Sequence, residues 1–224
     1  RLGFLIVAFA VGVQFITFVL LFSRLITNYS LEEALWQSFF HSISAFNNAG
    51  FTIFPDHSSL QSLQSDPFAL GVIGLSIILG SLSFPVINEL ARRRGYRRWT
   101  LDTKFVLIGT LGVWALGILT ILIFELSNPQ TIGDLSVSEK VTNSIFQAFT
   151  SRTAGFSTID FTHTRAGTDF MFMLLMFVGG ASGSVAGGIK INTAMVLSVA
   201  ALAAIRGRPN IEVMRREIPY SQVA

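Results

Sequence analysis

The sequence predicts an all-helical integral membrane fold in which a unit of helix, re-entrant loop and helix occurs twice in tandem. Three observations lead to this prediction. Of the 224 residues, 51% are hydrophobic and only 13% are charged, a far more apolar composition than that of soluble domains. Several charge-poor stretches are long enough to cross a bilayer. A short motif also recurs at an offset of about 105 residues, which indicates an internal repeat.

The charge-poor stretches run over residues 2–22, 68–88, 105–124 and 170–205. Each of the first three matches the roughly 20 residues that a helix needs to cross a hydrocarbon core of about 30 Å. Pro85 lies late in the second stretch and should kink or end that helix. The fourth stretch is too long for one span and is rich in glycine, so we expect a broken helix. Unwound backbone at membrane depth is tolerated where it lines a cavity, so the break indicates a pathway.

The positions of the charges predict which connections lie inside the cell. Basic residues gather in two connections: Arg92, Arg93, Arg94, Arg97, Arg98 and Lys104, then Arg206, Arg208, Arg215 and Arg216. Residues 28–67 hold no lysine or arginine, and their acidic residues are Glu32, Glu33, Asp56 and Asp66. The positive-inside rule then places both basic connections in the cytoplasm. The net charge of +3 is explained by this topology, so no nucleic-acid partner is predicted.

Two semi-apolar stretches, residues 35–46 and 141–149, lie between the spans of each pair. Helices of that length reach about half-way through a membrane. Because both basic connections lie inside, each stretch must leave and re-enter the outer face. We expect a helix at 2–27, a pore loop at 34–54, a helix at 67–91, a helix at 101–126, a pore loop at 141–159 and a broken helix at 169–206. The first repeat then covers 1–95, the second 96–206, and 207–224 forms a cytoplasmic connection toward a missing repeat.

The internal repeat extends beyond one motif. Ser38-Phe39-Phe40-His41-Ser42 leads to Asn48-Ala49-Gly50-Phe51-Thr52, and Ser144-Ile145-Phe146-Gln147-Ala148 leads to Thr153-Ala154-Gly155-Phe156-Ser157, with one residue gained or lost. Later, Gly80-Ser81-Leu82-Ser83 matches Gly179-Gly180-Ala181-Ser182. Both copies have the same direction across the membrane. Parallel repeats of this kind arrange around an axis along the membrane normal, which predicts a central pore as in potassium channels.

A cation that crosses a bilayer needs oxygens to replace its hydration shell, and rings of backbone carbonyls supply them. Gly50 and Gly155 each follow a short helix, whose C-terminal end favours a cation in front of it. We predict coordination by the carbonyls of Asn47, Asn48, Ala49, Gly50 and Phe51, and of Arg152, Thr153, Ala154, Gly155 and Phe156. A tight loop on the membrane surface is the alternative, which the double occurrence of the motif disfavours.

Two segments, 42–51 and 151–156, resemble filter loops of the Trk/Ktr/HKT cation transporter superfamily. The family's intramembrane gating loop resembles a third segment, which comprises Gly179, Gly180, Ala181, Ser182, Gly183, Ser184, Val185, Ala186, Gly187, Gly188, Ile189 and Lys190. The motif Asn-Asn-Ala-Gly-Phe is more similar to that of the bacterial Ktr-type potassium uptake subunit than to that of the Trk type. The resemblance covers essentially the whole chain, which would correspond to repeats two and three of four. An opening residue other than methionine, Arg1, also favours a fragment.

The resemblance implies passive potassium uptake by a multi-pass protein of the plasma membrane, of the bacterial inner-membrane type. It also implies a homodimer and a cytosolic nucleotide-binding regulatory ring on the basic inner face. No cofactor is expected, and one glycine per loop leaves sodium passage or activation by sodium open. Two alternatives are an alternating-access secondary transporter, with slow saturable uptake, and a membrane scaffold that transports nothing.

The glycine-rich segment has two further interpretations. Gly183 and Gly188 have the spacing of a phosphate-binding loop, but Ile189 stands where the motif requires lysine, and Lys190 is displaced by one residue. Small residues also favour close helix packing, which is compatible with gating. Lys190 is interpreted either as part of an obstruction below the filter or as a lysine that reaches the cytoplasmic interface.

The remaining polar residues indicate no enzyme. Arg152 is expected to tie its loop to Glu125, Glu139 or Asp160, with an exposed arginine as the alternative. Asp160 either enriches cations at the outer mouth or is a simple loop residue. The histidines, which are His41, His57 and His163, are too scattered for a metal site. Without cysteine, neither a disulfide nor a thiolate metal site is available.

Overall fold

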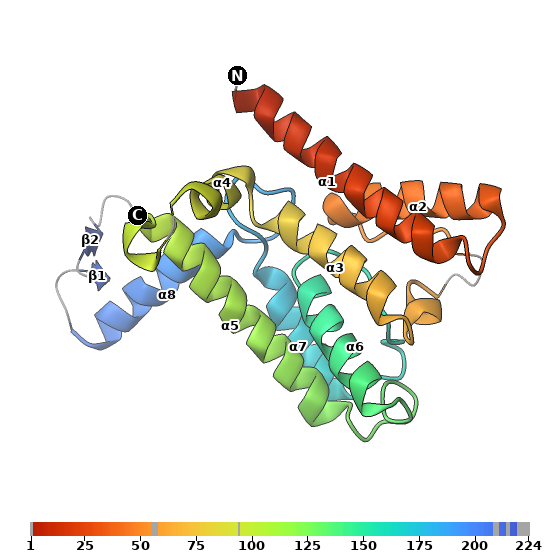
Figure 1. Ribbon diagram of the computed structural model, residues 1–224. Helices are drawn as coiled ribbons and strands as arrows, with labels where there is room; N and C mark the ends of the chain where they lie inside the picture. The colour runs from red at the N-terminus through yellow and green to blue at the C-terminus, as the bar shows by residue number, and fades with distance from the viewer. Residues whose placement is uncertain (1, 55–57, 94, 208–210, 214–215, 219–224) are drawn as a thin grey trace.

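The computed structural model describes residues 2–54, 58–93, 95–207, 211–213 and 216–218 (Figure 1). Asp56, His57, Arg94, Arg208 and Arg215, which entered the predictions above, lie outside the described residues. The helices are α1 (Leu2–Leu25), α2 (Leu31–Phe46), α3 (Pro67–Ser81), α4 (Phe84–Arg92), α5 (Leu101–Phe124), α6 (Val137–Thr150), α7 (Ala166–Phe177) and α8 (Ile191–Ile205). Two 3-10 turns, η1 (Gln61–Leu63) and η2 (Tyr96–Arg98), precede α3 and α5.

Helices α1 and α5 are each 24 residues long and apolar enough to cross a membrane. The predicted helices at 2–27 and 101–126 are therefore confirmed. Thr100 begins α5, because its side-chain oxygen accepts a hydrogen bond from the Thr103 N–H. Most apolar side chains of α1 are exposed, for instance Phe4 and Phe15, as expected of a helix that faces lipid.

The single helix predicted at 67–91 is wrong, because α3 ends at Ser81 and α4 begins at Phe84 with a bend of 97° between them. Pro85, expected to kink or end the helix, lies at this break. Proline has no N–H to donate to the carbonyl four residues earlier, here that of Ser81. The Ser81 carbonyl instead accepts a hydrogen bond from the Ala181 N–H at 2.9 Å, and the Gly80 carbonyl accepts one from the Val185 N–H at 3.3 Å.

The short helices α2 and α6 begin three to four residues before the predicted positions because each opens with a capping box. Ser30 and Glu33 form the box of α2, and Ser136 and Glu139 form that of α6. The two capping serines are 106 residues apart, whereas Gly50 and Gly155 are 105 apart. The predicted difference of one residue between the repeats therefore lies between the capping serine and the loop glycine of each repeat.

The last span is broken, as predicted, into α7 and α8 with a non-helical segment at 178–190, which we call the gating loop. Val178 and Ile189 form a parallel β-bridge that closes the base of this loop. The segment expected as a cytoplasmic connection contains a short antiparallel hairpin of β1 (Ile211–Val213) and β2 (Arg216–Ile218).

The two helical units pack against each other through α3 and α6, as Figure 1 shows. Glycine permits the close approaches inside each unit. A Cβ on Gly80 of α3 would stand 1.9 Å from the carbonyl oxygen of Phe46, and one on Gly117 of α5 would stand 2.9 Å from the Cβ of Ala148. The buried core crosses the unit boundary, because Phe146 and Phe156 pack with apolar residues of α1 and α3.

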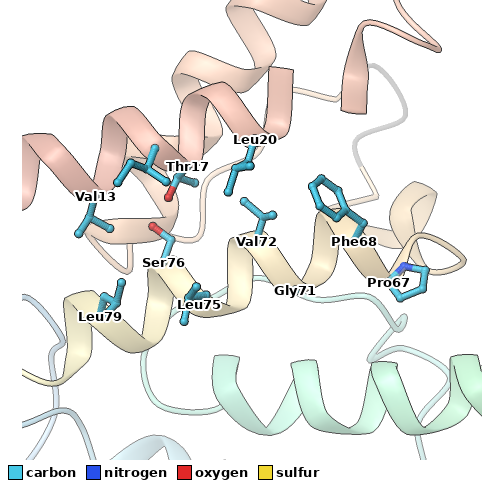
Figure 2. Close-up of a pocket in the computed structure, with 11 residues that line it drawn as sticks. Val13, Thr17, Leu20, Pro67, Phe68, Gly71, Val72, Leu75, Ser76 and Leu79 are labelled. Carbon is cyan, nitrogen blue, oxygen red and sulfur yellow. The ribbon is translucent and has the colours of Figure 1, made fainter. Parts of the chain in front are cut away.

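A groove of about 310 Å³ runs between α1 and α3 (Figure 2). Its walls are mainly aliphatic and aromatic side chains, including Val13, Leu20, Phe68 and Leu75. Such a lining suits hydrocarbon rather than a hydrated cation. The polar loops between the helices are therefore the candidates for a cation site.

Candidate functional site

The two predicted filter loops meet at their glycines. Gly50 has φ +71° and Gly155 has φ +80°, a left-handed conformation that favours glycine. A Cβ on Gly50 would stand 2.7 Å from both the Ala154 oxygen and the Gly155 Cα, and one on Gly155 would stand 3.1 Å from the Gly50 Cα. Both positions thus require glycine for conformation and for space.

The same backbone pattern occurs in both loops. Asn48 has φ +49° and Thr153 has φ +62°, each two residues before the glycine of its loop. A left-handed residue changes the direction of the peptide groups beside it, so the backbone turns in the same way in both loops. The sequence predicted the glycines, but the left-handed conformations of Asn48 and Thr153 were not foreseen.

Each loop is fastened to the end of its short helix. In the first loop the Ala49 N–H donates to the Ser44 carbonyl at 2.9 Å, and in the second the Ala154 N–H donates to the Thr150 carbonyl at 3.2 Å. The Ser44 hydroxyl also donates to the Phe51 carbonyl at 2.8 Å. The Phe51 carbonyl, predicted as an ion ligand, therefore keeps one lone pair for a cation.

A pair of equivalent side chains supports the two loops from behind. His41 Nε2 accepts a hydrogen bond from the Ile53 N–H at 3.4 Å, and its Nδ1 donates to the Gln37 carbonyl at 2.7 Å. In the second unit, Gln147 Oε1 accepts from the Thr158 N–H at 3.3 Å. His41 was weighed above only as a metal ligand, and its role as a brace was not predicted. The signal was available, since His41 and Gln147 occupy matching positions of the repeat.

Backbone oxygen atoms are the ion ligands that this arrangement can offer. The ends of α2 and α6, near Phe46 and Thr150, carry the partial negative charge of a helix C-terminus and lead directly into the loops. Ala49 and Gly155 keep exposed surface, so solvent reaches both loops. Hard oxygen donors and a negative helix end suit an alkali cation, whereas they provide no soft ligand for a transition metal.

The side chain of Arg152 is buried, with 1% of its surface exposed, and it joins three elements. Its guanidinium donates to the Thr110 hydroxyl of α5 at 2.8 Å and to the Gly179 carbonyl of the gating loop at 2.5 Å. The predicted tie from Arg152 to Glu125, Glu139 or Asp160 is wrong, and so is the alternative of an exposed arginine. Glu139 instead caps α6 through Ser136, and Asp160 accepts from Thr162.

Glu125, which does not bind Arg152, joins the connection after α5 to the start of α7. It lies at the C-terminal end of α5 and accepts hydrogen bonds from Asn128 and Thr131, from the Arg165 N–H at 2.9 Å, and from the Thr168 hydroxyl. Burial raises the pKa of this carboxyl group, but the hydrogen bonds outweigh burial and hold the pKa below its ordinary value. Glu125 is thus an ionised anchor that lies apart from the filter loops.

The gating loop lies against the break between α3 and α4. Its Ala181 and Val185 N–H groups satisfy the two carbonyls freed at that break. The base of the loop is closed by the Gly179 N–H, which donates to the Ile189 carbonyl at 2.9 Å. A Cβ on Gly179 would stand 1.6 Å from the Gly187 oxygen, so the two arms of the loop approach as closely as backbones can.

Two side chains connect the gating loop to its surroundings. Lys190 donates from Nζ to the Ala186 carbonyl at 2.5 Å, which keeps its ammonium group with the loop. On the filter side, the Thr153 hydroxyl accepts a hydrogen bond from the Gly187 N–H at 3.0 Å. The predicted gating loop and the second predicted filter loop are therefore in direct contact. Lys190 as an obstruction stays a prediction.

Comparison with known proteins identifies the family of this chain. Over residues 2–224 the sequence matches the family described as TrkH, a cation transport protein. It is 41% identical over 212 residues to the Ktr system potassium uptake protein B of Bacillus subtilis (strain 168), covering 95% of this chain and 47% of that protein. It is 33% identical over 220 residues to the protein of the same name from Vibrio alginolyticus, covering 97% and 48%.

A third relative is the potassium/sodium uptake protein NtpJ of Enterococcus hirae, which is 32% identical over 223 residues and covers 100% of this chain and 49% of that protein. The chain thus spans about half the length of these relatives. In fold it is similar to the crystal structure of the potassium transporter TrkH from Vibrio parahaemolyticus, with a TM-score of 0.69, 17% identity, and coverage of 95% of this chain and 44% of that one. The chain therefore belongs to the TrkH family of cation transport proteins, which are membrane transporters rather than enzymes.

Proposed function

We propose that the full-length protein takes up potassium through a pore in which the two glycine loops form part of a selectivity filter. The observation that supports this proposal is the contact between Gly50 and Gly155, whose backbones meet although 105 residues separate them. In this proposal the two loops, with their matching left-handed residues, contribute peptide groups to one passage. Similarity to potassium uptake proteins of about twice this length agrees with a pore completed by further repeats.

The ligands in this proposal are the backbone carbonyls of residues 47–51 and 152–156. Carbonyl dipoles that stay fixed in the membrane replace the hydration shell of the ion without adding net charge. The helices α2 and α6 end at these loops and contribute a negative potential. The bracing by His41 and Gln147 holds the carbonyls in place when no ion is present.

The gating loop is proposed to obstruct the passage below the filter. It lies in contact with the second filter loop through Gly187 and Thr153. It is also held at the break between α3 and α4 by two backbone hydrogen bonds. A loop of 13 residues between α7 and α8 can move without unfolding either helix.

Partners are proposed on the resemblance together with the basic face. Arg92 and Arg93 at the end of α4 and Arg97 and Arg98 in η2 are exposed and form a positive surface. Two relatives are named as components of a Ktr system, and we propose that a cytosolic nucleotide-binding ring docks on this face and that the protein is a homodimer. Light scattering of the purified complex tests both, since a monomer without bound ring would contradict them.

Growth at low potassium tests the proposed function. The full-length gene is expressed in bacterial cells that lack their own potassium uptake. The native protein should restore growth, and Gly50→Asp or Gly155→Asp should abolish it, because the new side chain collides with the facing loop. Gly50→Ala and Gly155→Ala, paired with Gly112→Ala on α5, where nothing lies within 4 Å of a Cβ, separate the collision from the introduction of a charge.

Failure of the native protein to restore growth, despite its presence in the membrane, would reject potassium uptake. A scaffold predicts no tracer uptake at all. An alternating-access transporter predicts saturable uptake without unitary current, so a bilayer recording separates it from a pore.

A further inference from the structure

We propose that Thr153 is a positioning residue that joins the second filter loop to the gating loop by one hydrogen bond, which must break before the gating loop can leave its place. The inference rests on the proposed function and adds a coupling between filter and gate. It would make the shape of the filter depend on the position of the gating loop.

The proposed latch between the two loops is a single hydrogen bond, accompanied by a van der Waals contact. The Gly187 N–H donates to the Thr153 hydroxyl oxygen at 3.0 Å. A Cβ on Gly187 would lie 3.9 Å from the Cβ of Thr153, which is ordinary van der Waals distance. The two loops therefore touch at this point, with the hydroxyl as the acceptor.

Backbone strain at Thr153 is the second, independent observation. Its φ of +62° is a left-handed conformation that β-branched residues rarely adopt. The equivalent residue in the first unit is Asn48, a type that tolerates this conformation. Strain of this kind persists where the surrounding structure holds it, and it marks positions whose side chain has a role. The hydroxyl that receives Gly187 provides that role.

The latch distinguishes the two filter loops. Asn48 is buried, and neither polar atom of its side-chain amide has a partner in the part of the chain that the structure describes. Thr153 instead joins the gating loop, and the adjacent Arg152 donates to the carbonyl of Gly179 at the base of that loop. Consecutive residues of one filter loop thus hold both arms of the gating loop.

Closure at its base makes the gating loop move as one body. The bridge between Val178 and Ile189 keeps the two ends together, so displacement of the loop carries Gly187 away from Thr153. Once released, Thr153 loses the bond that holds its strained backbone, and the filter loop can relax. The consequence is that opening of the gating loop and a change in the backbone at Thr153 occur together.

Thiol labelling of the full-length protein tests the latch without any need for transport. The 224 residues contain no cysteine, and any cysteine in the rest of the full-length protein is first replaced by serine. The buried Ser184 hydroxyl has no hydrogen-bond partner among the described residues. Ser184→Cys therefore reports loop opening by its rate of labelling. Added Thr153→Val, which removes the hydroxyl but keeps the shape, should raise this rate about fivefold, the effect of one lost hydrogen bond on an opening equilibrium. Added Thr153→Ser, which keeps the hydroxyl, should not.

Two controls isolate the latch. Thr142→Val on α6 removes a hydroxyl that bonds only within its own helix and should leave the rate unchanged. Ser76→Cys, buried in α3, should label slowly in every background, because faster labelling there reports general unfolding. Equal rates for Thr153→Val and Thr153→Ser at residue 184 would overturn the proposal. Tracer uptake by the native protein reports the proposed function separately, since the labelling result stands whether or not ions pass.

Discussion

Gly50 lies against Gly155 so closely that a Cβ atom on the first would stand 2.7 Å from the Cα atom of the second. The contact joins two loops that each follow a short capped helix. It explains why both repeats carry glycine at this position, since either substitution brings two backbones into collision.

Potassium should stabilise the full-length protein. An ion that binds the folded filter but not the unfolded chain raises stability with its concentration, by about 2.7 kcal/mol at 100 times the dissociation constant. Thermal unfolding in detergent should therefore shift upward by several degrees when potassium chloride replaces choline chloride. Equal unfolding temperatures in the two salts would contradict ion binding by the folded protein.

Tracer uptake should survive replacement of His41 by the glutamine that occupies the matching position of the second repeat, but not loss of the hydrogen-bond acceptor. Because His41 and Gln147 accept the same kind of backbone N–H, His41→Gln should keep tracer uptake near the native level. His41→Leu leaves the Ile53 N–H without its acceptor and should lower uptake about fivefold, as expected for one lost hydrogen bond. If His41→Gln and His41→Leu were equally impaired, the bracing role would be refuted.

Arg152 should not be replaceable by lysine. A guanidinium reaches Thr110 and Gly179 at once, whereas an ammonium on a flexible stem reaches one of them and stays a buried charge. Arg152→Lys should therefore lower the free energy of unfolding by about 2 kcal/mol, and the neutral Arg152→Gln should lower it less. Denaturation of both variants in the same detergent gives the comparison, and the reverse order would argue against this account.

Glu125 should stabilise the protein in a pH-dependent way. Its folded pKa lies below the ordinary 4.5, so the folded protein binds this proton less readily than the unfolded chain does. The stabilisation is then complete above pH 4.5 and declines as the pH falls toward the folded pKa. Glu125→Gln should cost about 2 kcal/mol at pH 7, and the difference from the native protein should shrink in acid. A difference that grows as the pH falls would contradict the assignment.

The sequence was sufficient for the parts of the fold that depend on local patterns. Apolar length predicted α1 and α5, and the repeated Ala-Gly-Phe motif predicted that the loops at Gly50 and Gly155 are equivalent. Hydropathy alone did not place the starts of α2 and α6. The capping boxes at Ser30 and Ser136 set them, and these could have been recognised from the Ser-x-x-Glu spacing.

Features that depend on tertiary contacts were not predictable in the same way. The break between α3 and α4 is sharper than a proline kink because the gating loop supplies N–H donors to the freed carbonyls of Gly80 and Ser81. Arg152 pairs with Thr110 and Gly179 rather than with a carboxylate, and no spacing in the sequence brings those residues together. Such contacts join segments that are far apart along the chain, and no pattern in the sequence predicts that these segments meet.

The most direct measurement of the central claim is tracer rubidium uptake by liposomes that contain the full-length protein or its Gly50→Ala variant. The added methyl group would stand 2.7 Å from the Ala154 carbonyl oxygen, so the variant should lose nearly all uptake while Gly112→Ala, which meets nothing within 4 Å, retains it. Native rates of uptake by a folded Gly50→Ala protein would show that the meeting of the two loops does not form the ion path.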